Sequence, residues 1–273
     1  MPSRRTKNRY GAYGKATHVS DADRADDREA VPAWLFLDFD GVICDSLEEC
    51  YQSSRLAEAA IKIDAASLPP DTRDEGYRER FRAARPFVRS GEDYVVLHRL
   101  LAEGKVPKSQ AEFDRALAGL GAEDLANMKR RLYLVRDALL EYHRHLWLGW
   151  NPLYPGMAQA LARLAGNGRV FIVSTKRASF IAEILSFNKI GWPVSRILYS
   201  GTERKLAIIE HVAGPESSML IDDQVDHLEP GHPSCESRLA LWGYVSPGNA
   251  MTGIPGMSLQ DCLRLLGRFG NSR

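Results

Sequence analysis

The chain has 273 residues and a formal net charge of +1, because 36 basic side chains nearly balance 35 acidic ones. This balance argues against a nucleic-acid binder that relies on a broad basic surface, whereas a small anionic substrate is compatible with it. The length can bury a sizeable core, and it suits one α/β domain with an insertion or two modest domains.

The spacing of the cysteines and the lengths of the apolar runs predict where in the cell the protein is located. The four cysteines show no CxxC pair and no regular spacing, so neither a disulfide framework nor a structural zinc site is indicated. No apolar run approaches membrane-spanning length, and no apolar segment of the signal-peptide kind follows the basic N-terminus. We therefore expect a cytoplasmic protein without a membrane partner.

The first 30 residues contain few large apolar side chains. A basic stretch comes first, and an acidic cluster of four aspartates between residues 21 and 27 follows it. Such a segment cannot bury enough apolar surface to offset the entropy lost on ordering. The sequence predicts a disordered tail over residues 1–30.

The apolar run 33–37 predicts a buried strand, and it ends in the acidic segment DFDGVICDS. Ligands gather beyond the carboxyl ends of such strands in parallel α/β sheets. Asp38 and Asp40 are close enough to share a divalent cation, and Gly41 allows the backbone to turn sharply. Cys44 in the same loop has no adjacent basic partner to lower its pKa, and we interpret it as a packing residue.

Helical and strand patterns then divide the rest of the chain. Helices are predicted near 46–63, 74–85, 91–103, 108–119 and 123–148. Strands are predicted near 169–174, 197–200, 218–222 and 238–245, with helices near 156–166, 178–189, 203–213 and 258–269. The strand–helix alternation predicts a doubly wound parallel sheet, and the helical block after the first strand is an insertion.

Two of the later strands also end in polar residues. The strand at 169–173 leads into Ser174, and the apolar run 219–221 leads into Asp222, Asp223 and Asp226. Acids crowded at a strand end repel one another unless a cation or hydrogen bonds compensate.

Taken in order, these segments resemble the haloacid dehalogenase superfamily, whose first motif is Asp-x-Asp-Gly after a hydrophobic strand. The resemblance implies a Rossmann-like core at 31–46 and 150–273, with an α-helical cap domain inserted at 47–149. Val42 departs from the pattern, because many members carry Thr after the glycine.

The resemblance also implies phosphate-binding residues. It puts a Ser or Thr at the end of the second strand, which is Ser174 here, with Thr175 as its alternative. It puts a Lys or Arg at the start of a later helix, and we choose Lys205 over Arg204 and Lys176.

A magnesium ion held by Asp38, Asp40 and Asp222 is implied in the same way, and this ion suits carboxylates combined with a substrate phosphate. Asp223 and Asp226 both stay open as the second acid, which would bind the ion or orient its waters and Lys205. The seven histidines offer no zinc site, since none of their groupings supplies four ligands.

These roles imply a magnesium-dependent phosphatase acting on a small phosphorylated metabolite. Asp38 would attack phosphorus to form an aspartyl-phosphate, and Asp40 would protonate the leaving oxygen and then activate water. A phosphomutase and a non-catalytic binding module on the same fold remain the alternatives. No nucleic-acid partner is expected, and the oligomeric state stays open.

One segment of the inserted block suggests how a substrate is selected. Helical spacing puts Arg78, Arg82 and Arg85 on one face before Pro86 ends the helix. Arginine suits bidentate recognition of carboxylate or phosphate, so the stripe predicts either a site for a second acidic group or a solvated cationic face.

Overall fold

The computed structural model describes residues 31–66, 74–246, 248 and 253–271. The tail predicted over residues 1–30 lies outside these residues. Pro32–Arg273 form one compact unit. In the described part of the chain, no helix is both long enough and apolar enough to cross a membrane.

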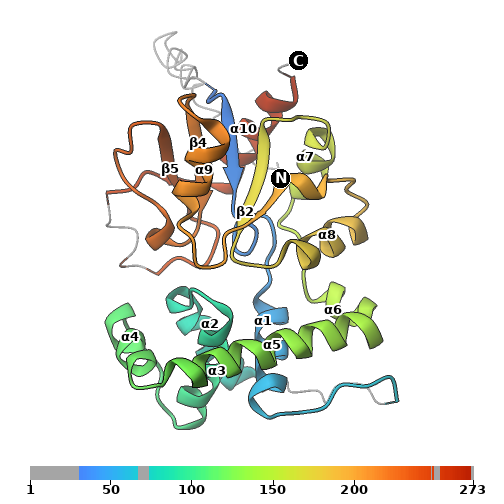
Figure 1. Cartoon of the computed structure of the whole chain (residues 1–273), viewed down its shortest axis with the longest axis vertical. Helices are drawn as coiled ribbons and strands as arrows, with labels where there is room; N and C mark the ends of the chain where they lie inside the picture. Colours follow the sequence, from blue (N-terminus) through green and yellow to red (C-terminus); the bar gives the residue numbers. More distant parts are fainter. Residues whose placement is uncertain (1–30, 67–73, 247, 249–252, 272–273) are drawn as a thin grey trace, which may run out of the picture. The chain divides into compact units, whose positions relative to one another are not determined.

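A parallel six-stranded sheet forms the core of this unit, with the order β3-β2-β1-β4-β5-β6 among the described residues (Figure 1). The strands are β1 (Trp34–Leu37), β2 (Val170–Ser174), β3 (Ile197–Tyr199), β4 (Ser218–Asp222), β5 (Cys235–Ala240) and β6 (Gly256–Met257). The chain builds outward from β1 through β2 and β3, then returns to the other side of β1 for the remaining strands. This confirms the predicted doubly wound α/β fold.

Four α-helices in the described part of the chain belong to the core. They are α7 (Met157–Leu164), α8 (Ala178–Phe187), α9 (Lys205–Ala213) and α10 (Leu259–Asn271), with short 3-10 turns η3 (Val194–Arg196) and η4 (Val225–His227). On one face of the sheet, Phe36 and Leu220 pack against Ile209 of α9. The alternating residues Leu37 and Ile221 point to the other face and are also fully buried, as expected for strands covered on both sides.

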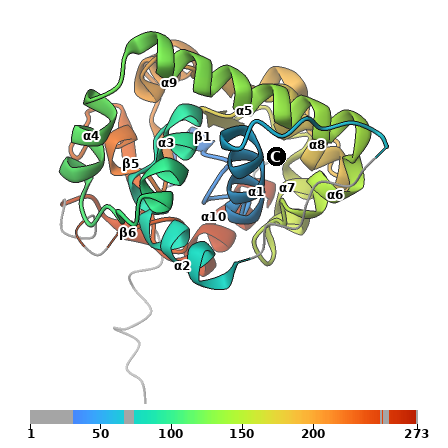
Figure 2. The same ribbon diagram turned by 90° about the horizontal axis from the view of Figure 1, so that it is seen from below.

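The predicted helical insertion lies between β1 and β2 and forms the cap. Its elements are α1 (Leu47–Glu58), α2 (Glu75–Ala84), η2 (Arg85–Phe87), α3 (Gly91–Ala102), α4 (Gln110–Ala118), α5 (Ala122–Tyr142) and α6 (Arg144–Gly149). Helices α1, α3 and α5 pack on one another. The cap lies beyond one end of the strands, and α1 and α3 lie in front of β1 when viewed from that side (Figures 1 and 2).

Three predicted elements have clearly different bounds. The helix predicted over 46–63 ends at Glu58. The long helix predicted over 123–148 breaks at His143, which leaves the helical region at φ −132° and ψ 41°, so that α6 starts anew. The strand predicted over 238–245 ends at Ala240, because the aromatic segment after it turns back over the loop that follows β1. There Trp242 Nε1 donates to the Val42 carbonyl at 3.0 Å, and the Tyr244 hydroxyl donates to Asp45 Oδ1 at 2.8 Å.

Candidate active site

The carboxyl ends of β1 and β4 lie side by side, and both lead into acidic residues. Leu37 pairs with Ile221 in the sheet, and the Asp38 N–H donates to the Ile221 carbonyl at 2.9 Å. One carboxylate oxygen from each of Asp38, Asp222 and Asp223 lies within 4.8 Å of the other two. We call these three buried side chains the acidic cluster.

Lys205, the first residue of α9, supplies a positive charge to this cluster. Its Nζ lies 2.8 Å from Asp38 Oδ1 and 2.7 Å from Asp222 Oδ2, and its side chain is only 1% exposed. His227 approaches the same Asp222 oxygen, with Nδ1 at 3.1 Å. Burial alone would raise the pKa of Asp222, but Lys205 and His227 hold it well below its ordinary value.

The other two carboxylates are less well compensated. Burial raises the pKa of Asp38, with the charge of Asp222 adding to the effect and Lys205 opposing it. Burial also raises the pKa of Asp223 to about 8, against the opposing charge of Arg85. Asp223 Oδ2 accepts the Tyr244 N–H at 2.7 Å, but Oδ1 is buried and has no hydrogen-bond partner among the described residues. A cation would satisfy this oxygen, so the residues present fit a metal site.

Two glycines make room for Asp223. A Cβ added at Gly41, where φ is +86°, would lie 2.2 Å from Asp223 Oδ2. A Cβ added at Gly243 would lie 2.4 Å from Asp223 Cβ and 2.5 Å from the Gly41 carbonyl oxygen. Only a residue without a side chain fits at either position, because backbone and a buried carboxylate occupy the space.

Asp40 lies outside the acidic cluster. Its Oδ1 pairs with Lys176 Nζ at 2.9 Å, and its side chain retains 16% exposure. The expected metal ligands were Asp38, Asp40 and Asp222, but the structure brings Asp223, and not the Asp40 side chain, together with the other two. The Asp40 carboxylate instead pairs with Lys176, which follows β2.

The two candidates for the second acid lie in different places in the structure. Asp223 is part of the acidic cluster, whereas Asp226 forms an ion pair with Arg89 of the cap. Arg89 also pairs with Asp114 on α4 at 2.6 Å. Asp226 therefore links the core to the cap and does not reach the cluster.

The residues considered for phosphate binding also differ in their surroundings. Ser174 is buried, and its Oγ accepts the Lys176 N–H at 3.3 Å. Its alternative Thr175 lines the pocket in front of the acidic cluster. Arg204, the alternative to Lys205, is exposed and pairs with Glu229 at 2.8 Å. The assignment of Ser174 to phosphate binding stays a prediction.

The arginine stripe expected in the cap does not form. Helix α2 ends at Ala84, and Pro86 forces a tighter 3-10 turn, so Arg85 no longer follows the helical spacing. Arg78 pairs with Glu48 and Arg82 is exposed, whereas Arg85 is buried and lines the pocket. Arg78, Arg82 and Arg85 therefore do not share one anion-binding face.

Arg85 has an unusual environment for a buried cation. Its guanidinium lies over two tyrosine rings, 4.2 Å from the centroid of Tyr244 and 5.2 Å from that of Tyr94. Nη1 donates to the Val88 carbonyl at 3.2 Å, and Nε has no hydrogen-bond partner within the described residues. The tyrosine faces stabilise the charge in part, but no acid forms an ion pair with it in the described part of the chain.

The space between the cap and the strand ends has two parts. An inner pocket of about 40 Å³ contains Asp38, Asp40, Asp223, Arg85 and Lys176 in its wall. An outer pocket of about 360 Å³ adjoins it, and both contact Arg89, Ser90, Thr175 and His227. The inner pocket has room for about one water-sized group, whereas the outer one has the size of a small-molecule site.

No family model matches the chain, and no curated protein matches it either. Among solved structures, a predicted phosphoglycolate phosphatase from Haemophilus somnus has a TM-score of 0.55 at 14% identity, covering 87% of this chain and 99% of its own. A haloacid dehalogenase-like family hydrolase from Streptococcus pneumoniae has a TM-score of 0.50 at 14% identity, with coverage of 86% and 97%. The chain has the haloacid dehalogenase fold.

Another similar structure, Protein Tyrosine Kinase A of Mycobacterium tuberculosis, has a TM-score of 0.52 at 17% identity, covering 87% of this chain and 99% of its own. At these identities the likeness shows the haloacid dehalogenase fold alone. The three proteins have different names although they share a fold, so activity must be argued from the site.

On this haloacid dehalogenase fold, sequence reasoning missed two buried charged residues, Glu49 of α1 and Arg136 of α5. Glu49 is 0% exposed and accepts two hydrogen bonds from Arg136, at 2.7 and 2.8 Å. An acid and a base 87 positions apart give no local signal. The apolar residues Leu47, Cys50 and Tyr51 next to Glu49 are the one local sign that Glu49 lies on the buried face of its helix.

The close approach at Gly243 makes a stability prediction. Gly243→Ala should lower the free energy of unfolding by about 1–3 kcal/mol, because the new methyl group overlaps Asp223 and the Gly41 carbonyl. Urea denaturation followed by circular dichroism measures this change. Gly149→Ala, where an added Cβ meets nothing within 4 Å, is the control and should be as stable as wild type or slightly more stable, because alanine suits a helix better than glycine. Equal stability of all three proteins would show that the loop relaxes freely around Asp223.

Proposed function

We propose that this protein is a magnesium-dependent phosphatase that hydrolyses a small phosphate monoester through an aspartyl-phosphate. The observation that carries the proposal is the separation of Asp38 and Asp40 into different charge environments. Asp38 shares the acidic cluster with Lys205, whereas Asp40 pairs with Lys176 on the pocket wall. Two carboxylates in distinct environments can act as nucleophile and as acid/base in a single reaction.

In the first step, an Asp38 oxygen attacks phosphorus while the bond between phosphorus and the substrate oxygen breaks. Asp40 gives its proton to that leaving oxygen, and the alcohol departs. Lys205 favours the ionised, attacking form of the Asp38 carboxylate. Ser174 or Thr175 would bind a phosphoryl oxygen at the end of β2.

In the second step, Asp40 takes a proton from a water molecule, which attacks phosphorus. The bond between phosphorus and the Asp38 oxygen breaks, releasing inorganic phosphate and restoring both carboxyl groups. The two aspartates thus return to their starting states after each turnover.

The acidic cluster would hold the magnesium ion. Asp38, Asp222 and Asp223 provide carboxylate oxygens, and Asp223 Oδ1 is buried without a hydrogen-bond partner among the described residues. When bound, magnesium would neutralise charge on the transferring phosphoryl group. Lys205 shares that role from α9, where it already bridges Asp38 and Asp222.

Arg85 supports a narrower proposal about the substrate. A buried guanidinium without an ion-pair partner is costly, and an anionic substrate group would complete its contacts. We therefore propose a small substrate with a second anionic group beside the phosphate, such as 2-phosphoglycolate. The cap residue Arg85 would bind that group, and the core would bind the phosphate.

The two aspartates can be distinguished by substitution. Asp38→Asn should form no phosphoenzyme and lose phosphate release, because no attacking carboxylate remains. Asp40→Asn should still accept the phosphoryl group from p-nitrophenyl phosphate, whose leaving group needs no proton, but should release phosphate about 10²–10⁴-fold more slowly. Rapid-quench trapping of phosphoenzyme measures both effects.

Wild-type turnover by Asp38→Asn would rule out the covalent mechanism. A wild-type protein that transfers the phosphoryl group within the substrate and releases no inorganic phosphate would be a phosphomutase. A protein that binds phosphorylated compounds without turnover would be a binding module.

The metal assignment predicts a dependence on divalent cations. Removing them with a chelator should abolish phosphate release, and added magnesium should restore it. Asp223→Asn should raise the magnesium concentration needed for half-maximal activity, because a carboxylate ligand is lost. Magnesium should also raise the melting temperature of wild type more than that of Asp223→Asn, since a bound ion stabilises the folded state. Full activity in excess chelator would contradict the assignment.

The Arg85 proposal predicts a contrast between substrates. Arg85→Met keeps much of the packing on Tyr94 and Tyr244 but removes the charge, so KM for 2-phosphoglycolate should rise about 10- to 100-fold. Phenyl phosphate has no second anion, and its kinetics should change little. Arg82→Met, an exposed arginine of the same segment, is the matched control and should change neither substrate. Equal losses on both substrates in Arg85→Met would return Arg85 to a structural role.

A further inference from the structure

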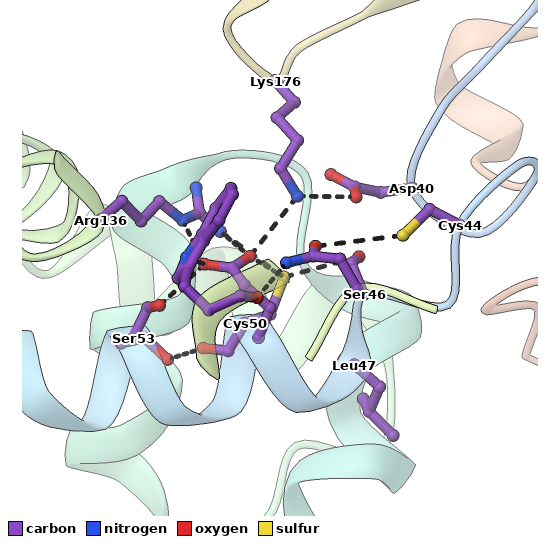
Figure 3. A network of polar contacts seen from close by, with 12 residues as sticks. Asp40, Cys44, Ser46, Leu47, Cys50, Ser53, Arg136 and Lys176 are labelled. Atoms are coloured by element: carbon purple, nitrogen blue, oxygen red, sulfur yellow. Dashed lines mark hydrogen bonds and ion pairs between the residues drawn. The ribbon is translucent and has the colours of Figure 1, made fainter. Parts of the chain in front are cut away.

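A second group of buried charges runs from the pocket wall into the cap. Lys176 Nζ lies 2.9 Å from Asp40 Oδ1 and 3.4 Å from Glu49 Oε2. Arg136 binds the Glu49 carboxylate with Nε and Nη2, at 2.7 and 2.8 Å. The charges alternate in sign from Asp40 to Arg136, and we call these four residues the charge network (Figure 3).

Glu49 is the fixed centre of this network. Besides Arg136 and Lys176, its Oε1 accepts the Ser53 hydroxyl at 2.7 Å and the Trp147 indole N–H at 3.1 Å. Burial alone would raise the pKa of Glu49, but Arg136 and Lys176 lower it to about 2. The carboxylate is therefore charged, hydrogen-bonded at both oxygens and held in one place by α1, α5 and α6.

Lys176, in contrast, depends on its acidic partners for its position. Its side chain is long, 1% exposed and bonded only through Nζ to Asp40 and Glu49 among the described residues. The Arg136 charge acts against that of Lys176, and Glu49 lies between them as the compensating charge. Without Glu49, two buried cations would repel each other and the ammonium would be held from one side only.

The network also crosses from the cap to the core. Glu49 and Arg136 belong to cap helices, whereas Lys176 follows β2 and Asp40 follows β1. Arg136, Lys176 and Asp40 all line the inner pocket. The location of the Asp40 carboxylate is thus tied to the place of the cap helices on the strand ends.

We propose that Glu49 is a positioning residue that holds Lys176 against Asp40, and so keeps the Asp40 carboxyl at the pocket wall where the leaving group and the attacking water meet. This inference rests on the proposed role of Asp40 as acid/base. It assigns to a buried cap glutamate, which touches no substrate, a part in the rate of the chemical steps.

Glu49→Gln tests the proposal, because it preserves the shape of the side chain and removes its charge. We expect kcat with a small alkyl phosphate to fall about 10- to 100-fold, as for partial loss of acid/base catalysis, while KM changes less than about twofold. With p-nitrophenyl phosphate, a full burst of nitrophenolate should precede slow turnover, because only hydrolysis of the phosphoenzyme then needs Asp40. A merely structural defect would instead reduce the burst amplitude together with the melting temperature.

Glu48→Gln is the matched control. The same chemical change then lies one residue away on α1, on a glutamate that pairs with Arg78 and Gln52 and not with Lys176. Its kcat should equal that of wild type. If Glu49→Gln folds poorly, Glu49→Asp keeps a charge beside Arg136 and withdraws the carboxylate from Lys176, and the same loss of kcat is expected.

A double-mutant cycle decides whether Glu49 acts through Lys176. Lys176→Met should itself slow turnover, and adding Glu49→Gln should cause no further loss, since the residue that Glu49 positions is gone. Losses that multiply, or an unchanged kcat in both Glu49→Gln and Glu49→Asp, would overturn the inference. Neither result would affect the proposed phosphatase activity, for which Asp38→Asn is the separate test.

Discussion

The structure depends on compensating the negative charge that β1 and β4 bring together at one edge of the sheet. Because the two strands are parallel neighbours, one carboxylate oxygen from each of Asp38, Asp222 and Asp223 lies within 4.8 Å of the other two. All three side chains are buried. Such an arrangement is stable only when cations or hydrogen-bond donors face it. Lys205 and the Tyr244 N–H meet this requirement, whereas Gly41 and Gly243 leave the space that the Asp223 side chain occupies.

The same requirement explains why Asp38 and Asp40 are each paired with a lysine of their own. Lys205 comes from the start of α9 and serves Asp38, whereas Lys176 comes from the end of β2 and serves Asp40. If a single cation lay between the two carboxylates, they would have similar environments. Because each carboxylate pairs with a different cation, the two groups are suited to different steps of the proposed reaction.

The cap completes the site at the carboxyl ends of the strands. It supplies Arg85, which lies on tyrosine faces, and Glu49, which supports Lys176. The ion pair between Arg89 and Asp226 joins the two parts at the rim. With these contacts made, the inner pocket encloses only about 40 Å³. Because cap and core residues share the wall of this pocket, a movement of the cap would change both the space in front of Asp38 and the surroundings of Asp40.

The parallel α/β sheet, the helical insertion and the presence of acids at the ends of β1 and β4 could be predicted from the sequence, because strand and helix periods and acids at strand ends are local patterns. The predicted end of β5 was wrong because tertiary contacts determine it. Trp242 and Tyr244 have strand-forming side chains, but they hydrogen-bond to the loop after β1. The choice of Asp223 over Asp40 for the acidic cluster came from three-dimensional structure alone, and so did the pairing of Glu49 with Arg136. Both depend on which opposite charge lies closest after folding, and that distance is not written in the spacing of residues along the chain.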